Sequence, residues 1–80
     1  MSIQEQLNQV FQLVFDDNSI QIRPDTTADD IEGWDSLSHV NLMVAVESAF
    51  GVEFGQREIL AFRNVGDLML GIEKKLAQQK

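Results

Sequence analysis

Residues 36–50 constrain the fold most strongly, because they combine helical periodicity with apolar side chains on two sides. At about 100° per residue, one side of such a helix carries a core stripe. The members of this stripe are Leu42, Met43, Val46, Ala49 and Phe50. The other side carries a second apolar stripe of Leu37, Val40 and Val44. In an 80-residue chain, we expect either a long loop to cover the second stripe or a partner to dock on it.

Three further segments repeat apolar residues at spacings of three and four, which predicts helices over residues 3–15, 56–62 and 65–78. Ser2 and Asn64 are suitable N-caps, and Asp67 is placed to reach back from the first turn of the last helix. Gly51 follows the 36–50 helix as a C-terminal glycine commonly does. Gly71 is predicted on the outer side of the last helix, where it weakens that helix.

A long irregular connection joins the first two predicted helices. Ile20-Gln21-Ile22 alternates as a strand would, but no second strand-like run is present to pair with it, so we predict extended loop. Four apolar residues are the expected anchors of this connection: Ile20, Ile22, Ile31 and Trp34. The predicted fold class is all-α, a small four-helix bundle with three longer helices and one short one. Residues 1–80 are expected to form one domain.

Composition excludes several kinds of site and partner. The absence of cysteine excludes disulfides, thiolate metal sites and a cysteine nucleophile. No run of roughly twenty apolar residues and no signal peptide are present, so we expect a cytoplasmic protein without membrane insertion. The acidic residues lack the spacing of a calcium loop, and no glycine-rich phosphate loop occurs. No metal site is therefore predicted.

Negative charge is concentrated in front of the 36–50 helix. The chain has thirteen acidic and six basic side chains and a net charge of −7. Residues 16–35 contain seven acids and one base, Arg23, so this stretch carries −6. This distribution argues against nucleic acid as the main partner and favours partners with basic patches.

The segment Gly33-Trp34-Asp35-Ser36-Leu37 places Ser36 at the first turn of the helix. A phosphate attached there would be stabilised by unpaired backbone N–H groups and by the helix dipole. The alternative is that Asp35 and Ser36 only cap the helix. A catalytic serine is disfavoured, because the one histidine, His39, is expected at the edge of the core and no Gly-x-Ser-x-Gly elbow surrounds Ser36. The chain is predicted not to be an enzyme.

This segment, followed by Val40, Glu47, Phe50 and Gly51, resembles the acyl carrier protein family, and the resemblance covers nearly the whole chain. It implies that Ser36 bears a covalent 4′-phosphopantetheine whose thiol holds acyl groups as thioesters. It also implies that Asp35 supports the phosphopantetheinyl transferase, through the magnesium ion of that enzyme. Partner enzymes that load and process acyl groups would bind four residues: Leu37, Val40, Val44 and Glu47. We expect a free-standing monomer.

Two departures from the family bear on the cargo. Carriers of fatty acid synthesis place acids where this chain has Ser38 and Asn41, which favours a dedicated polyketide, natural-product or modified-lipid pathway. Peptidyl carriers usually have small residues before the Asp or His that precedes the serine, and Trp34 departs from that pattern. The alternatives are an aminoacyl or peptidyl carrier and a small acidic adaptor with no prosthetic group.

Overall fold

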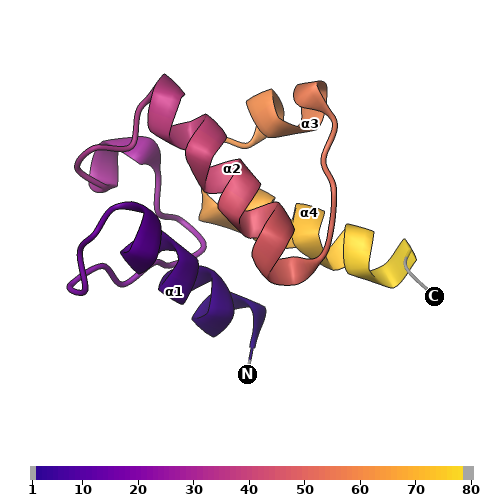
Figure 1. The fold of residues 1–80 in the computed structure, drawn as a ribbon, viewed down its shortest axis with the longest axis horizontal. Helices are drawn as coiled ribbons and strands as arrows, with labels where there is room; N and C mark the ends of the chain where they lie inside the picture. The colour runs from indigo at the N-terminus through magenta and orange to yellow at the C-terminus, as the bar shows by residue number, and fades with distance from the viewer. Residues whose placement is uncertain (1, 79–80) are drawn as a thin grey trace.

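A computed structural model describes residues 2–78 of the chain. The helices follow one another as α1 (Ile3–Val14), α2 (Ser36–Phe50), α3 (Gln56–Ala61) and α4 (Val65–Gln78), and the described residues contain no strand (Figure 1). The predicted all-α fold of three longer helices and one short helix is confirmed. A short 3-10 helix, η1 (Ala28–Asp30), interrupts the long connection and was not predicted. No helix in this part of the chain is long and apolar enough to cross a membrane.

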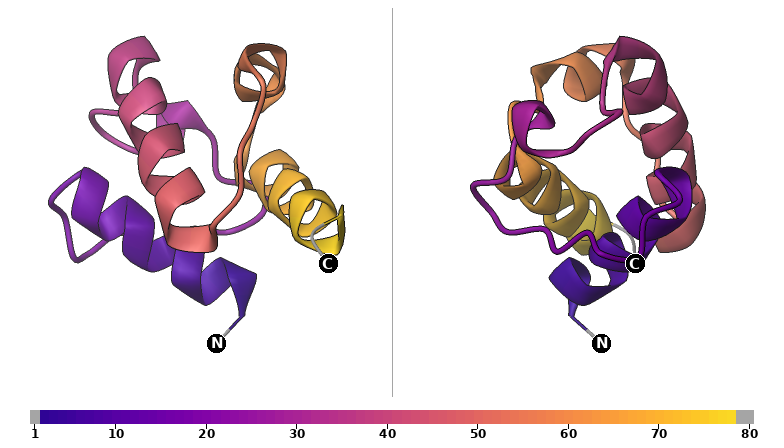
Figure 2. Two further views of the ribbon diagram at one scale, coloured as in Figure 1. Left: turned by 45° about the vertical axis from the view of Figure 1, so that its right-hand side comes forward. Right: turned by 90° about the vertical axis from the view of Figure 1, so that its left-hand side faces the viewer.

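The core lies among α1, α2 and α4, each of which contributes three buried side chains. Those residues are Leu7, Val10, Phe11, Leu42, Met43, Val46, Val65, Leu68 and Ile72. The connections add Ile20, Ile22, Val52 and Phe54 to the same cluster. The short helix α3 has no fully buried residue and lies beside the start of α2, away from the N-terminus (Figures 1 and 2). The bundle is therefore built on three helices, with α3 attached at one end.

For two helical residues, Ala49 and Gly71, the predicted side of the helix is wrong. Ala49 is exposed, so the core stripe of α2 narrows to Leu42, Met43 and Val46, with Phe50 half-buried. Gly71 faces the protein, because a Cβ there would lie 2.9 Å from Cε1 of Phe62 and 3.3 Å from Cε1 of Phe54. The two phenylalanine rings pack edge to face with their centroids 5.3 Å apart. The glycine thus gives this aromatic pair room against α4.

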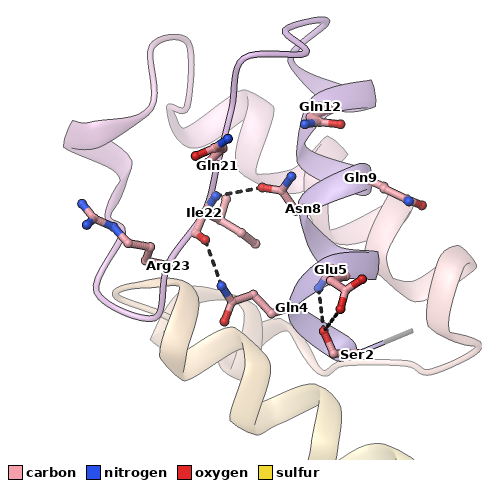
Figure 3. Close-up of a pocket in the computed structure, with 9 residues that line it drawn as sticks. All are labelled: Ser2, Gln4, Glu5, Asn8, Gln9, Gln12, Gln21, Ile22 and Arg23. Atoms are coloured by element: carbon pink, nitrogen blue, oxygen red, sulfur yellow. Dashed lines mark hydrogen bonds between the residues drawn. The ribbon is translucent and has the colours of Figure 1, made fainter.

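The long connection is held by helices on both sides, which explains why it needs no strand partner. The Ile22 amide donates to Oδ1 of Asn8 over 2.8 Å, and Nε2 of Gln4 donates to the Ile22 carbonyl over 3.2 Å (Figure 3). On the other side, the Gly66 amide at the start of α4 donates to the Pro24 carbonyl over 2.7 Å. The predicted anchors Ile20 and Ile22 are buried, whereas Ile31 and Trp34 are partly buried.

Candidate functional site

Asp35, and not Ser36, is the N-cap of α2. Its Oδ1 accepts hydrogen bonds from the amides of Leu37 and Ser38, both at 3.0 Å. The Ser38 hydroxyl completes a capping box by accepting from the Asp35 amide over 2.7 Å. Gly33, with φ of +89°, supplies the left-handed backbone that leads the chain into this cap. The prediction that Asp35 caps the helix is confirmed, and the contribution of Ser38 was missed.

Ser36 occupies the first residue of α2 and is exposed. Its hydroxyl makes none of the hydrogen bonds found within residues 2–78. The hydroxyl is therefore accessible, and the interpretation that Ser36 caps the helix with its side chain is wrong. However, Asp35 already takes up the amides of Leu37 and Ser38, so the predicted set of unpaired N–H groups around a phosphate on Ser36 is smaller than expected.

Hydrogen bonds stabilise the charged form of the Asp35 carboxylate. The Ser38 amide is the main cause of a lowered pKa for Asp35, and the Ser38 hydroxyl and Leu37 amide act in the same direction. The two amides donate to Oδ1, and the Ser38 hydroxyl lies 3.1 Å from the same oxygen but closer, at 2.6 Å, to the Gly33 carbonyl. Oδ2 has no such partner in the described part of the chain, so this oxygen is available to a cation.

His39 is a structural link and not a base for Ser36. The Trp34 indole Nε1–H, which can only donate, points to Nδ1 of His39 over 3.0 Å. The proton of the neutral imidazole is consequently assigned to Nε2, which donates to the Ile59 carbonyl over 2.9 Å. The ring planes of Trp34 and His39 lie within 20° of each other with centroids 6.0 Å apart, as the in-plane N–H···N bond favours, and Trp34 also packs edge to face with Phe11. His39 thereby connects the segment before Ser36 to α3.

A pocket of about 340 Å³ lies between the start of α2 and α3, and Ser36 is one of its lining residues. Its walls are largely apolar, and its charged groups are Asp35 and Arg63. The lining is formed by Ala28, Trp34, Asp35, Ser36, His39, Val40, Leu60, Phe62 and Arg63. Sequence reasoning missed Leu60, Phe62 and Arg63, because no motif shows that residues more than twenty positions later face Ser36.

The second apolar stripe of α2 is open to solvent. Leu37, Val40 and Val44 expose 81%, 56% and 60% of their surface, so the alternative in which the long loop covers them is wrong. Leu60 of α3, 76% exposed, is a further apolar residue near this stripe, since it lines the same pocket as Val40. Large apolar side chains exposed together indicate a surface for a partner.

Glu47, which the resemblance placed on the partner surface, has a structural contact. It is half-buried, and its Oε2 accepts a hydrogen bond from the Phe54 amide over 2.8 Å. This bond fastens the extended link after α2 to the helix. The role of Glu47 in partner binding stays a prediction.

A larger concave region, of about 940 Å³, lies beside α1 and shares no lining residue with the pocket at Ser36 (Figure 3). Its wall is mainly glutamine and asparagine, and two of these side chains, Gln4 and Asn8, hold the backbone of Ile22. We interpret this region as the seam between α1 and the long connection. Residues 2–78 contain no group of three or more side chains suited to a metal ion.

Comparison with known proteins decides between the remaining interpretations. The family model for the phosphopantetheine attachment site matches residues 5–70. An acyl carrier protein of Solidesulfovibrio magneticus is 31% identical over 75 residues, which cover 94% of this chain and 96% of that protein. The chain belongs to the acyl carrier protein family. Membership confirms a carrier with covalent 4′-phosphopantetheine and not an enzyme, and it excludes an adaptor without a prosthetic group.

A solved structure supports the same assignment of this carrier. The solution structure of holo acyl carrier protein from Geobacter metallireducens is 43% identical and superimposes with a TM-score of 0.90. The alignment covers 99% of this chain and 91% of that one. Family membership implies that a phosphopantetheinyl transferase and the enzymes of a pathway are the partners of this carrier.

Proposed function

We propose that Ser36 is the attachment residue and that the thiol of its prosthetic group carries acyl intermediates as thioesters. The observation that carries the proposal is the exposed Ser36 hydroxyl, which has no hydrogen-bond partner among the described residues and stands at the start of α2. The group fits this position, because a pocket of about 340 Å³ adjoins the hydroxyl and can receive an arm anchored there. When bound, the group supplies the thiol that this cysteine-free chain lacks.

Asp35 supports the attachment in this proposal. Its Oδ1 fixes the first turn of α2 and so holds Ser36 in place, while Oδ2 remains available to the magnesium ion of the transferase. The Asp35 carboxylate is charged at neutral pH, as a ligand for magnesium must be, and its lowered pKa extends that charge further into acid.

The attachment is tested by incubating the purified protein with coenzyme A and a broad-specificity phosphopantetheinyl transferase. Intact mass spectrometry should show one added phosphopantetheine in the wild type and none in Ser36→Ala. The matched control is Ser48→Ala, because Ser48 is an exposed serine of the same helix. An unmodified wild type, or a modified Ser36→Ala protein, would show that the proposal is wrong.

We infer that Leu37, Val40 and Val44, together with Glu47, form the surface that partner enzymes bind. The exposure of the three apolar side chains supports this surface, and they follow Ser36 on the same helix. Burying a valine side chain in an interface contributes about 1.5–3 kcal/mol, which corresponds to at least about a tenfold change in affinity.

Val44→Glu tests this surface, because Val44 is exposed and does not line the pocket at Ser36. We expect kcat/KM of the phosphopantetheinyl transferase to fall at least about tenfold, since a charge would be placed in an apolar contact. Leu70→Glu is the control, because Leu70 of α4 has a similar exposure of 57%. Equal kcat/KM for both variants, with unchanged circular dichroism, would contradict the inference.

We further infer a dedicated pathway for polyketides, other natural products or modified lipids. The support is the scarcity of free acids on α2: Ser38 and Asn41 are uncharged, and Glu47 already binds the Phe54 amide. A basic patch on a fatty acid synthase would find little charge on this helix. Mass spectrometry of the protein isolated from its host would identify the thioester-bound group. Ordinary saturated fatty acyl chains would contradict this inference.

A further inference from the structure

Arg63 lies in the link between α3 and α4, where it lines the pocket at Ser36. It is exposed, and its guanidinium makes no hydrogen bond or ion pair with the described residues. Asp67, the nearest acid along the chain, accepts from the Arg63 backbone amide and not from the side chain. Two other cations of the described residues are paired, Arg23 with Asp25 and Lys75 with Glu58.

A phosphodiester attached to Ser36 would add negative charge that the Arg63 guanidinium can bind. Phosphopantetheine attachment places a phosphodiester, with one negative charge, beside the charged carboxylate of Asp35. The amides of Leu37 and Ser38 would normally stabilise an anion at a helix start, but Asp35 already occupies them. A cation near Ser36 would stabilise the new anion, and Arg63 is the cation among the residues lining the pocket.

We propose that Arg63 is a positioning residue that binds the phosphodiester on Ser36 and holds the start of the prosthetic arm against the pocket between α2 and α3. The proposal rests on attachment at Ser36. A guanidinium suits this task, since its planar fork of N–H donors matches two oxygens of a phosphate group. The apolar walls formed by Val40, Leu60 and Phe62 provide contacts for the carbon atoms that follow the phosphodiester.

The test compares the apo and holo proteins by NMR, after intact mass has shown complete modification of the holo sample. In the 15N-labelled wild type, the side-chain Nε–Hε resonance of Arg63 should shift on conversion to the holo form. The resonance of Arg57, an exposed arginine of α3 outside the pocket lining, should stay in place. An unmoved Arg63 resonance in fully modified protein would overturn the proposal.

Phosphorus NMR supplies a second readout that does not depend on activity. In holo Arg63→Gln, the 31P resonance should move toward its position in unfolded holo protein, and holo Arg57→Gln should match the wild type. The 31P resonance of holo Arg63→Lys should lie between those of the wild type and Arg63→Gln, because an ammonium group keeps the positive charge but lacks the paired N–H donors of a guanidinium. A 31P resonance that is the same in all four proteins would overturn the proposal.

These outcomes separate the two proposals. An unmodified mass in the wild type contradicts attachment at Ser36 itself. If the mass shows modification but the Arg63 resonance does not shift and the 31P resonance is the same in all four proteins, only the role of Arg63 is contradicted. Circular dichroism should show that Arg63→Gln is folded, because the side chain is exposed and makes no hydrogen bond with the described residues.

Discussion

Asp35 has two tasks that use different oxygen atoms. Oδ1 holds the first turn of α2 through the amides of Leu37 and Ser38, and Oδ2 is left for the transfer reaction. An asparagine side chain keeps one oxygen acceptor in the same geometry but has no negative charge, whereas alanine has neither. The two tasks can therefore be separated by substitution.

We expect Asp35→Asn to keep most of the free energy of unfolding and Asp35→Ala to lower it, because asparagine caps helices nearly as well as aspartate. Both variants should slow phosphopantetheine transfer, since neither can provide a carboxylate. Urea unfolding measures the first effect, and the initial rate of mass gain measures the second. Wild-type transfer rates in Asp35→Asn would contradict a role for the charge.

The stability that the Asp35 charge contributes should depend on pH. Because hydrogen bonds lower the pKa of Asp35 in the folded protein, its contribution is complete above the ordinary value of 3.8 and is lost as pH falls through the lower folded value. The difference in the free energy of unfolding between wild type and Asp35→Asn should shrink over that acid range. A difference that stays constant into acid would show that the charge adds nothing to the cap.

At the scale of the elements, α3 depends on few attachments. It has no fully buried side chain and is tied to the bundle by partly buried Ile59, by the His39 bond to the Ile59 carbonyl and by the 3.0 Å ion pair between Glu58 and Lys75. Elements with little buried surface open more easily than the core. Since α3 forms one wall of the pocket at Ser36, its opening would also open the site.

Replacing His39 with leucine should loosen α3 selectively. The substitution leaves the Trp34 indole N–H and the Ile59 carbonyl without their partners; a buried unpaired group costs about 1–3 kcal/mol, and these partly buried groups should cost less than that. We expect faster amide hydrogen exchange in α3, while Leu68 and Ile72 in α4 change only through the loss of global stability. A uniform change across all helices would show that His39 does not link α3 in particular.

The helices could be predicted from sequence because each has a 3–4 apolar repeat and local end signals, such as Ser2 and Gly51, that depend only on neighbouring residues. The surroundings of small residues were harder to predict: Ala49 is exposed although it follows the apolar repeat, and Gly71 lies against Phe54 and Phe62 from distant segments. The 3-10 turn at residues 28–30 lacks any apolar repeat. Asp35 and Ser36 could be identified from sequence because they belong to one local motif. Arg63 could not, because only the tertiary fold brings it to the pocket that Asp35 and Ser36 line.

On the scale of the whole molecule, the electrostatics are dominated by an excess of acidic side chains, few of which form ion pairs among the described residues. Thirteen acidic side chains face six basic ones in the sequence, and the ion pairs among the described residues are Arg23–Asp25 and Glu58–Lys75. A net charge of −7 is confined to a smaller volume in the folded protein than in the expanded unfolded chain, so the acids repel one another more strongly on average. Their mutual repulsion therefore destabilises the folded state.

We expect the melting temperature to rise as sodium chloride increases from about 0.02 to 0.2 M, because the screening length falls over this range to roughly the spacing of neighbouring charges. A triple variant, Asp16→Asn, Asp29→Asn and Glu32→Gln, should melt higher at low salt and gain less from added salt. The side chains of these three acids make no hydrogen bond or ion pair with the described residues. A melting temperature independent of salt in the wild type would contradict this explanation.

Trp34 is the one tryptophan of the chain, and it stands two residues before Ser36. Its indole is hydrogen-bonded to His39 through Nε1 and packs edge to face with Phe11, so its emission depends on contacts next to the start of α2. The protein thus has an intrinsic fluorophore at its own site. Because Trp34 lines the pocket at Ser36, a group entering that pocket is expected to change the emission of the unlabelled protein.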